Sequence, residues 1–336
     1  MKPTKLFRLL PAAVALAGLG LGGTGAAQAG SVYGVSHLEV DNLSIAITGS
    51  PAPNNFNFTA TNTAILNGVP TITSATCSGF PSTCAAAPPR LDPLPAQIPA
   101  ATRANNAFPN IGGFLGPGAS EYSTSDSVIY TAQLTGDAVT HTQQIAESEL
   151  QGGTSASASA QIQSITGFTF TFTLLSPGSL TLSFDADPDM MAAISALGIN
   201  GAQASMQTSF DLSQNTGGSG FARWTPQGTA ADDCAEGGGV TCTEAVGGDP
   251  LDLNLTIGTT SNGTSITHSL EAAKTLAGLY SITASGLTAG DWTLTLSAVT
   301  STNLTHVPEP ATLLLLGAGL AAFGVGGARR QKRHAV

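Results

Sequence analysis

Three aspartates at alternate positions, Asp185, Asp187 and Asp189, form the densest group of metal-binding side chains in the sequence. Carboxylate oxygens are the ligands that Ca²⁺ prefers, so the group predicts a calcium site at the end of a strand. The alternative is a solvated junction between strand and turn, with Pro188 ending the strand. We therefore expect either one bound Ca²⁺ or no cofactor.

Signatures of common enzymes are absent from the chain. No Gly-x-Ser-x-Gly elbow or P-loop occurs, and the histidines lack the spacing of a metalloprotease helix. A catalytic pair of carboxylates for glycoside hydrolysis stays an open alternative, because the two residues of such a pair come together only in the folded chain. Glu147 and Glu149 fall in a segment, residues 143–150, that we expect to be helical, where residues two apart do not share a face. We expect a protein without catalytic activity, with a secreted hydrolase as an alternative.

Two features suggest binding surfaces. Trp224 follows a Gly-rich turn, which favours an exposed ring that could stack on a sugar, whereas Trp292 lies in phase with apolar neighbours and is expected in the core. A carbohydrate-binding module is therefore an alternative function. The stretches 169–173 and 293–295 carry threonine at every second position, as an ice-binding face would, but threonine is also common on the wet face of a strand.

The four cysteines form two local pairs, Cys77 with Cys84 and Cys234 with Cys242. In an exported protein such pairs predict disulfides, and short-range closure within each pair is favoured among the three possible connectivities. Zinc is the competing interpretation. It is less favoured because the Cys-x-x-Cys spacing is absent and no histidine is close in sequence.

Both ends of the chain resemble targeting segments. Residues 1–29 combine basic residues, an apolar stretch and a small-x-small site at Ala29, which predicts a cleaved signal peptide. Near the other end, residues 311–328 carry no charge, and a helix of this length extends about 27 Å, close to the thickness of a bilayer core. The basic cluster that follows, with Arg329 and Arg330, is expected to stay cytoplasmic.

The order of these C-terminal features resembles the PEP-CTERM sorting signal of bacterial surface proteins. The resemblance covers residues 307–333 and includes Pro308, Glu309 and Pro310, then the apolar span and the basic cluster. It implies an exosortase-type processing enzyme as a partner. It also implies a precursor tethered to the inner membrane, which later reaches the cell surface or the extracellular space, where exopolysaccharide and biofilm material occur.

Charge is distributed unevenly along the chain. The body, residues 30–306, keeps four of the 11 Lys and Arg residues and 20 of the 21 Asp and Glu residues, so its formal charge is −16. Nucleic acid is excluded as a partner, because binding it requires Lys and Arg to displace counterions. The charge favours solubility at a crowded cell surface or attraction of cations.

Short alternating segments predict an all-β fold, an antiparallel β-sandwich or jelly-roll-like body with long loops, flanked by the signal peptide and one C-terminal transmembrane helix. A strand with a break near Asp41 opens the body. The Pro-rich region 51–117 is expected to be a loop excursion, and residues 167–175 and 179–185 a strand pair. Short helices are expected at 143–150, 190–197 and 271–277. The function we expect is a surface or extracellular-matrix protein.

Overall fold

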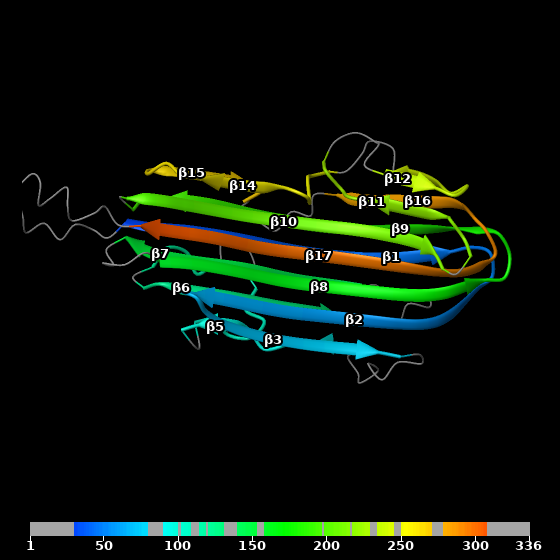
Figure 1. Cartoon of the computed structure of the whole chain (residues 1–336), viewed down its shortest axis with the longest axis horizontal. Coiled ribbons are helices and arrows are strands. Elements are labelled where there is room, and N and C mark those ends of the chain that lie inside the picture. Colours follow the sequence, from blue (N-terminus) through cyan, green and yellow to red (C-terminus); the bar gives the residue numbers. More distant parts are fainter. Residues whose placement is uncertain are drawn as a thin grey trace, which may run out of the picture.

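The structure, a computed structural model, describes the body of the chain. It covers residues 30–79, 90–99, 102–108, 114–118, 120–130, 140–152, 158–196, 198–215, 217–228, 234–244, 250–270 and 278–307. Two antiparallel sheets pack face to face in this part (Figure 1), which confirms the all-β prediction. No helix among the described residues could cross a membrane. The predicted signal peptide and the predicted membrane span at 311–328 lie outside the described residues.

Sheet A contains the N-terminal strand near its middle, in the order β13-β16-β9-β1-β7-β6-β4, with β15 also paired to β9 and β5 to β6. Its strands are β1 (Gly30–Ile47), β4 (Arg90–Leu91), β5 (Ala96–Ile98), β6 (Tyr122–Tyr130), β7 (Thr140–Gly152), β9 (Gly178–Ile194), β13 (Thr241–Glu244), β15 (Thr264–His268) and β16 (Leu279–Leu287).

Sheet B contains the last described strand in its middle, in the order β12-β11-β10-β17-β8-β2-β3, with β14 also paired to β10. Its strands are β2 (Pro51–Leu66), β3 (Val69–Ser78), β8 (Ala158–Leu174), β10 (Ile199–Gln214), β11 (Phe221–Trp224), β12 (Cys234–Gly237), β14 (Thr256–Thr259) and β17 (Gly290–Val307).

The core follows from alternation along the long strands. In β8, Phe168, Phe170 and Phe172 are buried, while Thr169 and Thr171 lie on the outer face, as the sequence predicts. The three phenylalanine rings follow one another at centroid distances of 6.1 and 5.3 Å. Burial of such rings between two sheets is the main apolar contribution to stability.

The expectation of a loop excursion over 51–117 is wrong for its first half. Residues 51–66 and 69–78 form the paired strands β2 and β3, joined by a tight turn at Asn67 and Gly68. Both turn residues have positive φ, 51° and 79°, which is the geometry of a two-residue hairpin turn that Asn-Gly favours. The high proline content of the whole region hid this hairpin. Pro70 is tolerated because β3 is an edge strand.

Two of the predicted helices are strands. Residues 143–150 lie within β7, between β1 and β6, and most of 190–197 completes β9. The third predicted helix, 271–277, lies outside the described residues. Pro188 stands inside β9, and it is tolerated because β16 pairs with β9 only up to Asp185 and β15 only from Met190 onward. The missing N–H of the proline falls in that gap.

Residues 167–175 and 179–185 are both strands, but they do not pair with each other. β8 lies in sheet B and β9 in sheet A, so the connection through Pro177 is a corner between the sheets. Thr48 and Gly49 form the neighbouring corner between β1 and β2. The two corners contact each other, since the Thr48 backbone N–H donates to the Ser179 carbonyl at 2.9 Å.

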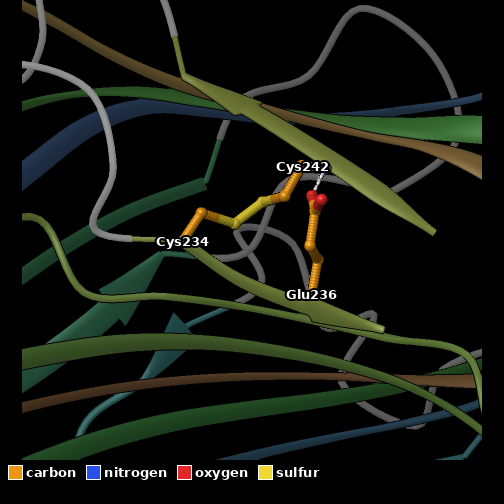
Figure 2. The surroundings of a disulfide bond; sticks show 3 residues. All are labelled: Cys234, Glu236 and Cys242. Carbon is orange, nitrogen blue, oxygen red and sulfur yellow. Dashed lines mark hydrogen bonds between the residues drawn. A yellow bond between two sulfur atoms is a disulfide. The ribbon is translucent and has the colours of Figure 1, made fainter. Parts of the chain in front are cut away.

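A disulfide joins the sheets at one edge of the sandwich. Cys234 belongs to β12 of sheet B and Cys242 to β13 of sheet A, with their Cα atoms 6.2 Å apart (Figure 2). The Cys242 backbone N–H also donates to the Glu236 carboxylate. The predicted Cys234–Cys242 pairing is thus confirmed. Cys77 is disulfide-bonded as well, and Cys84 lies outside the described residues.

The first and last described strands begin and end at the same end of the sandwich. β1 starts at Gly30, the residue that signal-peptide cleavage after Ala29 would leave first, and β17 ends at Val307 beside it (Figure 1). Gly34 lies against this part of β17, because an added Cβ there would be 3.0 Å from Leu304. The two ends of the described body therefore lie at the same end of the sandwich.

Candidate functional site

The outer face of sheet A carries a row of ionisable side chains where β1 and β9 pair. Residues two apart on a strand share a face, so the predicted aspartates of β9 lie on the same side as alternate residues of β1. The directly opposite pairs are Asp41 with Asp185, Glu39 with Asp187 and His37 with Asp189. We call the five acidic residues of these pairs the carboxylate row.

A bulge in β1 brings a third strand to this row. Two residues of β1, Asp41 and Asn42, lie opposite one residue of β7, His141, and Asn42 has a left-handed φ of 57°. Such bulges re-aim side chains, and here the ring nitrogen Nδ1 of His141 contacts the Asp41 carboxylate. The second nitrogen, Nε2, lies 3.8 Å from Glu39 Oε1.

Glu39, Asp41 and His141 form a convergent set. One ligand atom from each residue lies within 4.8 Å of the other two. The Glu39 side chain is 4% exposed, whereas those of Asp41 and His141 are 21% and 24% exposed, so the group is reached from solvent on one side. The ring of Tyr130 lies 5.4 Å from that of His141 and supports it.

The aspartates that the sequence singled out do not form such a set by themselves. Asp185, Asp187 and Asp189 lie inside β9, so the expected strand end at this point is wrong, and successive members stand about 6.6 Å apart along the strand. Asp185 accepts a hydrogen bond from Asn42 at 2.7 Å, and Asp189 contacts Nδ1 of His37 at 3.3 Å. Calcium binding at these three residues stays a prediction.

A further buried carboxylate, that of Glu147, lies on the neighbouring strand β7, outside the carboxylate row. Its side chain is fully buried and contacts Arg103, whose side chain is 2% exposed. Glu147 also accepts hydrogen bonds from the hydroxyl of Tyr33 at 2.6 Å and from the backbone N–H of Gly116 at 2.9 Å. These contacts hold the described residues 102–108 and 114–118 against the outer face of sheet A.

Because β7 is a strand, Glu147 and Glu149 do share a face, contrary to the sequence-based expectation. Glu149 accepts the backbone N–H of Gly118 at 2.7 Å, and burial raises its pKa. Burial and the nearby Glu147 carboxylate also raise the pKa of the Tyr33 and Tyr122 hydroxyls, which keeps both as neutral donors. Both glutamates are thus engaged in packing contacts.

The surface position expected for Trp224 is wrong. Its side chain is 1% exposed, as is that of Trp292, which was expected in the core. Trp224 packs 5.9 Å from the ring of Phe184 and lines an apolar cavity of about 90 Å³ between the sheets, together with Phe58 and Phe168. An indole inside the core cannot stack on a polysaccharide, so the glycan contact proposed for Trp224 loses its basis.

The threonine stretches of β8 and β17 lie side by side on the outer face of sheet B. Thr171 is opposite Thr293, and Thr169 is opposite Thr295. The hydroxyl of Thr293 contacts the Asn215 amide oxygen at 2.8 Å, and that of Thr171 donates to the Asn55 carbonyl at 3.3 Å. Sheet B therefore places threonines of two neighbouring strands side by side, which the sequence alone does not show. Ice binding stays a prediction.

Sequence patterns could identify two of the three residues of the convergent set. Glu39 and Asp41 are two apart in a segment predicted as strand, which indicates a shared face. Nothing in the spacing points to His141, which lies 100 residues further on and reaches Asp41 only through strand register.

Comparison with known proteins identifies only the C-terminal segment. No curated protein and no solved structure matches the chain. Residues 306–331 match the PEP-CTERM protein-sorting motif, which confirms the resemblance seen in the sequence. The match overlaps the last two residues of β17, His306 and Val307. The chain therefore carries a PEP-CTERM sorting signal and is an exported protein processed at the membrane by an exosortase.

Proposed function

We propose that the body is a non-catalytic structural component of the cell surface or extracellular matrix, associated with biofilm, which the sorting signal delivers. The observation that carries this proposal is the position of the signal, which begins where the central strand β17 ends. Processing beyond that point would deliver the folded sandwich without disturbing it.

The end of β17 is firmly held. The strand pairs with β10 through Val307 and with β8 through His306. His306 is 1% exposed, and its Nδ1 lies 2.6 Å from the Asn200 amide oxygen. Burial lowers the pKa of His306, which favours the neutral ring in the core. A cut at or after Pro308 would leave all of these contacts intact.

Two features favour a structural role over the alternatives. The glutamates considered for hydrolysis hold the described residues 102–108 and 114–118, with Arg103, Tyr33 and backbone N–H groups as partners. Both tryptophans of the chain are buried, so neither offers a platform for sugar stacking. These observations support a structural protein over a hydrolase or a carbohydrate-binding module.

Mass spectrometry of surface material tests the delivery step. We expect the body to be recovered without the peptide 311–336, and we expect a variant with Pro308, Glu309 and Pro310 replaced by alanine to stay in the inner membrane with that peptide attached. Recovery of the intact C-terminus on the cell surface would contradict processing but not anchoring.

A second experiment tests the role of the delivered body. Deletion of the gene should reduce the mass or cohesion of the extracellular matrix, and the purified chain should neither cleave nor retain on a column any of the polysaccharides extracted from that matrix. Specific retention of one polysaccharide would instead favour the carbohydrate-binding alternative, and its cleavage would favour the hydrolase.

A further inference from the structure

We propose that Glu39, Asp41 and His141 bind a first-row divalent transition-metal ion, with Zn²⁺ as the representative probe, on the outer face of sheet A. This inference is independent of the structural role proposed above. It differs from the calcium site that the sequence suggests, because it depends on a histidine from a third strand and not on the aspartates of β9.

The geometry fits a single small cation. Zinc binds histidine nitrogen and carboxylate oxygen at about 2.0–2.2 Å, so two ligand atoms on opposite sides of one ion are separated by about 4 Å. The ligand atoms of the three residues lie within 4.8 Å of one another. Nε2 of His141 and Oε1 of Glu39 are 3.8 Å apart, too far for a hydrogen bond but suited to an ion between them. The Asp41 carboxylate contacts the other ring nitrogen, Nδ1, so it would have to turn away from Nδ1 to join the same ion.

The donor types select the class of metal. Calcium takes six to eight oxygen ligands, whereas a mixed set of one imidazole nitrogen and two carboxylates suits zinc and its first-row neighbours. Three protein ligands leave a position for water, and the partial exposure of Asp41 and His141 opens that position to solvent. The Tyr130 ring packs against the His141 ring, with their centroids 5.4 Å apart and their planes tilted by 42°.

Local charge also favours a cation here. Glu39, 3% exposed, lies directly opposite Asp187, 6% exposed, and the next outward-facing pair is Asp41 opposite Asp185. Like charges directly opposite on neighbouring strands are destabilising. A divalent ion would lower the repulsion between the two carboxylates of each facing pair.

The bulge in β1 suggests a structural role for a bound ion. Regular pairing between β1 and β7 is interrupted between Val40 and Leu43, at the point where Asp41 faces His141. An ion held by both strands would link them where the ladder of hydrogen bonds is broken. Bulges that re-aim side chains commonly lie next to functional sites.

Zinc binding by the full chain, stripped with chelator, tests the proposal. Equilibrium dialysis with elemental analysis should find one tightly bound Zn²⁺ per chain, and zinc should raise the thermal midpoint, since a ligand that binds only the folded state stabilises it. His141→Gln and Glu39→Gln should each weaken zinc binding by at least tenfold. His268→Gln, which removes a histidine of β15 outside the cluster, is the matched control and should bind as the wild type does.

Glu39→Gln keeps the shape of the side chain and removes one charge opposite Asp187, so it should fold normally, which circular dichroism verifies. The proposal is overturned if the chain binds no zinc, or if both variants bind it within twofold of the wild type. It is also overturned if Ca²⁺ raises the midpoint of wild type and His141→Gln equally while zinc does not, because that result would place an oxygen-only site in the carboxylate row.

Discussion

Replacement of Arg103 by methionine should destabilise the body strongly, because it leaves the Glu147 carboxylate buried without its cation. The two side chains are 2% and 0% exposed. Breaking such a buried pair from one side costs about 3–5 kcal/mol. With a urea m-value of about 3 kcal/mol/M for a body of this size, the unfolding midpoint should fall by roughly 1–1.7 M.

The second half of this prediction concerns the double variant. Glu147→Gln in the Arg103→Met background removes the unpaired charge but keeps a carbonyl oxygen for the Tyr33 hydroxyl and the Gly116 N–H. We therefore expect the double variant to be more stable than Arg103→Met alone, by about 1–3 kcal/mol, the cost of a buried group left unsatisfied.

Urea unfolding followed by tryptophan fluorescence is a suitable assay, because Trp224 and Trp292 are both buried in the core. Arg223→Met is the matched control. Arg223 pairs with Asp211 at 2.7 Å, but the two side chains are 62% and 38% exposed, so its loss should cost about 0–1 kcal/mol. Equal effects of the two arginine replacements, or simple additivity in the double variant, would refute the reasoning.

Three further predictions follow from the fold. Replacing both Cys234 and Cys242 by alanine should cost about 2.5 kcal/mol, from the short loop that the disulfide closes over a sequence separation of 8; a loss below about 1 kcal/mol would contradict this. Burial raises the pKa of Asp126 to about 7, from 3.8, so the folded chain holds more protons than the unfolded chain between about pH 4 and pH 7. Stability should therefore fall as pH rises through this window, and less so in Asp126→Asn; thermal midpoints with equal pH dependence in both proteins would argue against it. Phe172→Ala should cost about 3–5 kcal/mol in the same urea assay, because the ring is 0% exposed, whereas Thr295→Ala on the outer face should change stability by less than about 0.5 kcal/mol. Similar losses in those last two variants would mean that the face assignment is wrong.

Strand prediction succeeded where large apolar residues alternate strictly with polar ones. Phe168, Phe170 and Phe172 are an example, because only a strand places all three on one face. It failed for residues 143–150, whose composition suits a helix. There β7 is paired on both sides, by β1 and β6, and is buried on both faces, and these tertiary contacts override local preference.

Only part of the candidate site could likewise be predicted from the sequence. The alternate spacing of Asp185, Asp187 and Asp189 indicates one shared strand face, and Glu39 and Asp41 have the same spacing although a strand break was expected near Asp41. The sequence contains no information that β1 and β9 pair in the register that aligns the two groups. Register depends on how all the strands bury their apolar faces together.

The sequence by itself indicated the sorting signal of this protein, because such a segment acts through linear order: a short motif, an apolar run and basic residues. It also favoured the Cys234–Cys242 pairing among three possible connectivities, since the two cysteines are close along the chain, and the structure confirms this pairing. Only the tertiary structure decided which ionisable groups meet. His141 reaches Asp41 at the bulge, and Arg103 contacts Glu147 of β7. Such contacts join distant parts of the chain, and strand pairing, not sequence spacing, sets their distances.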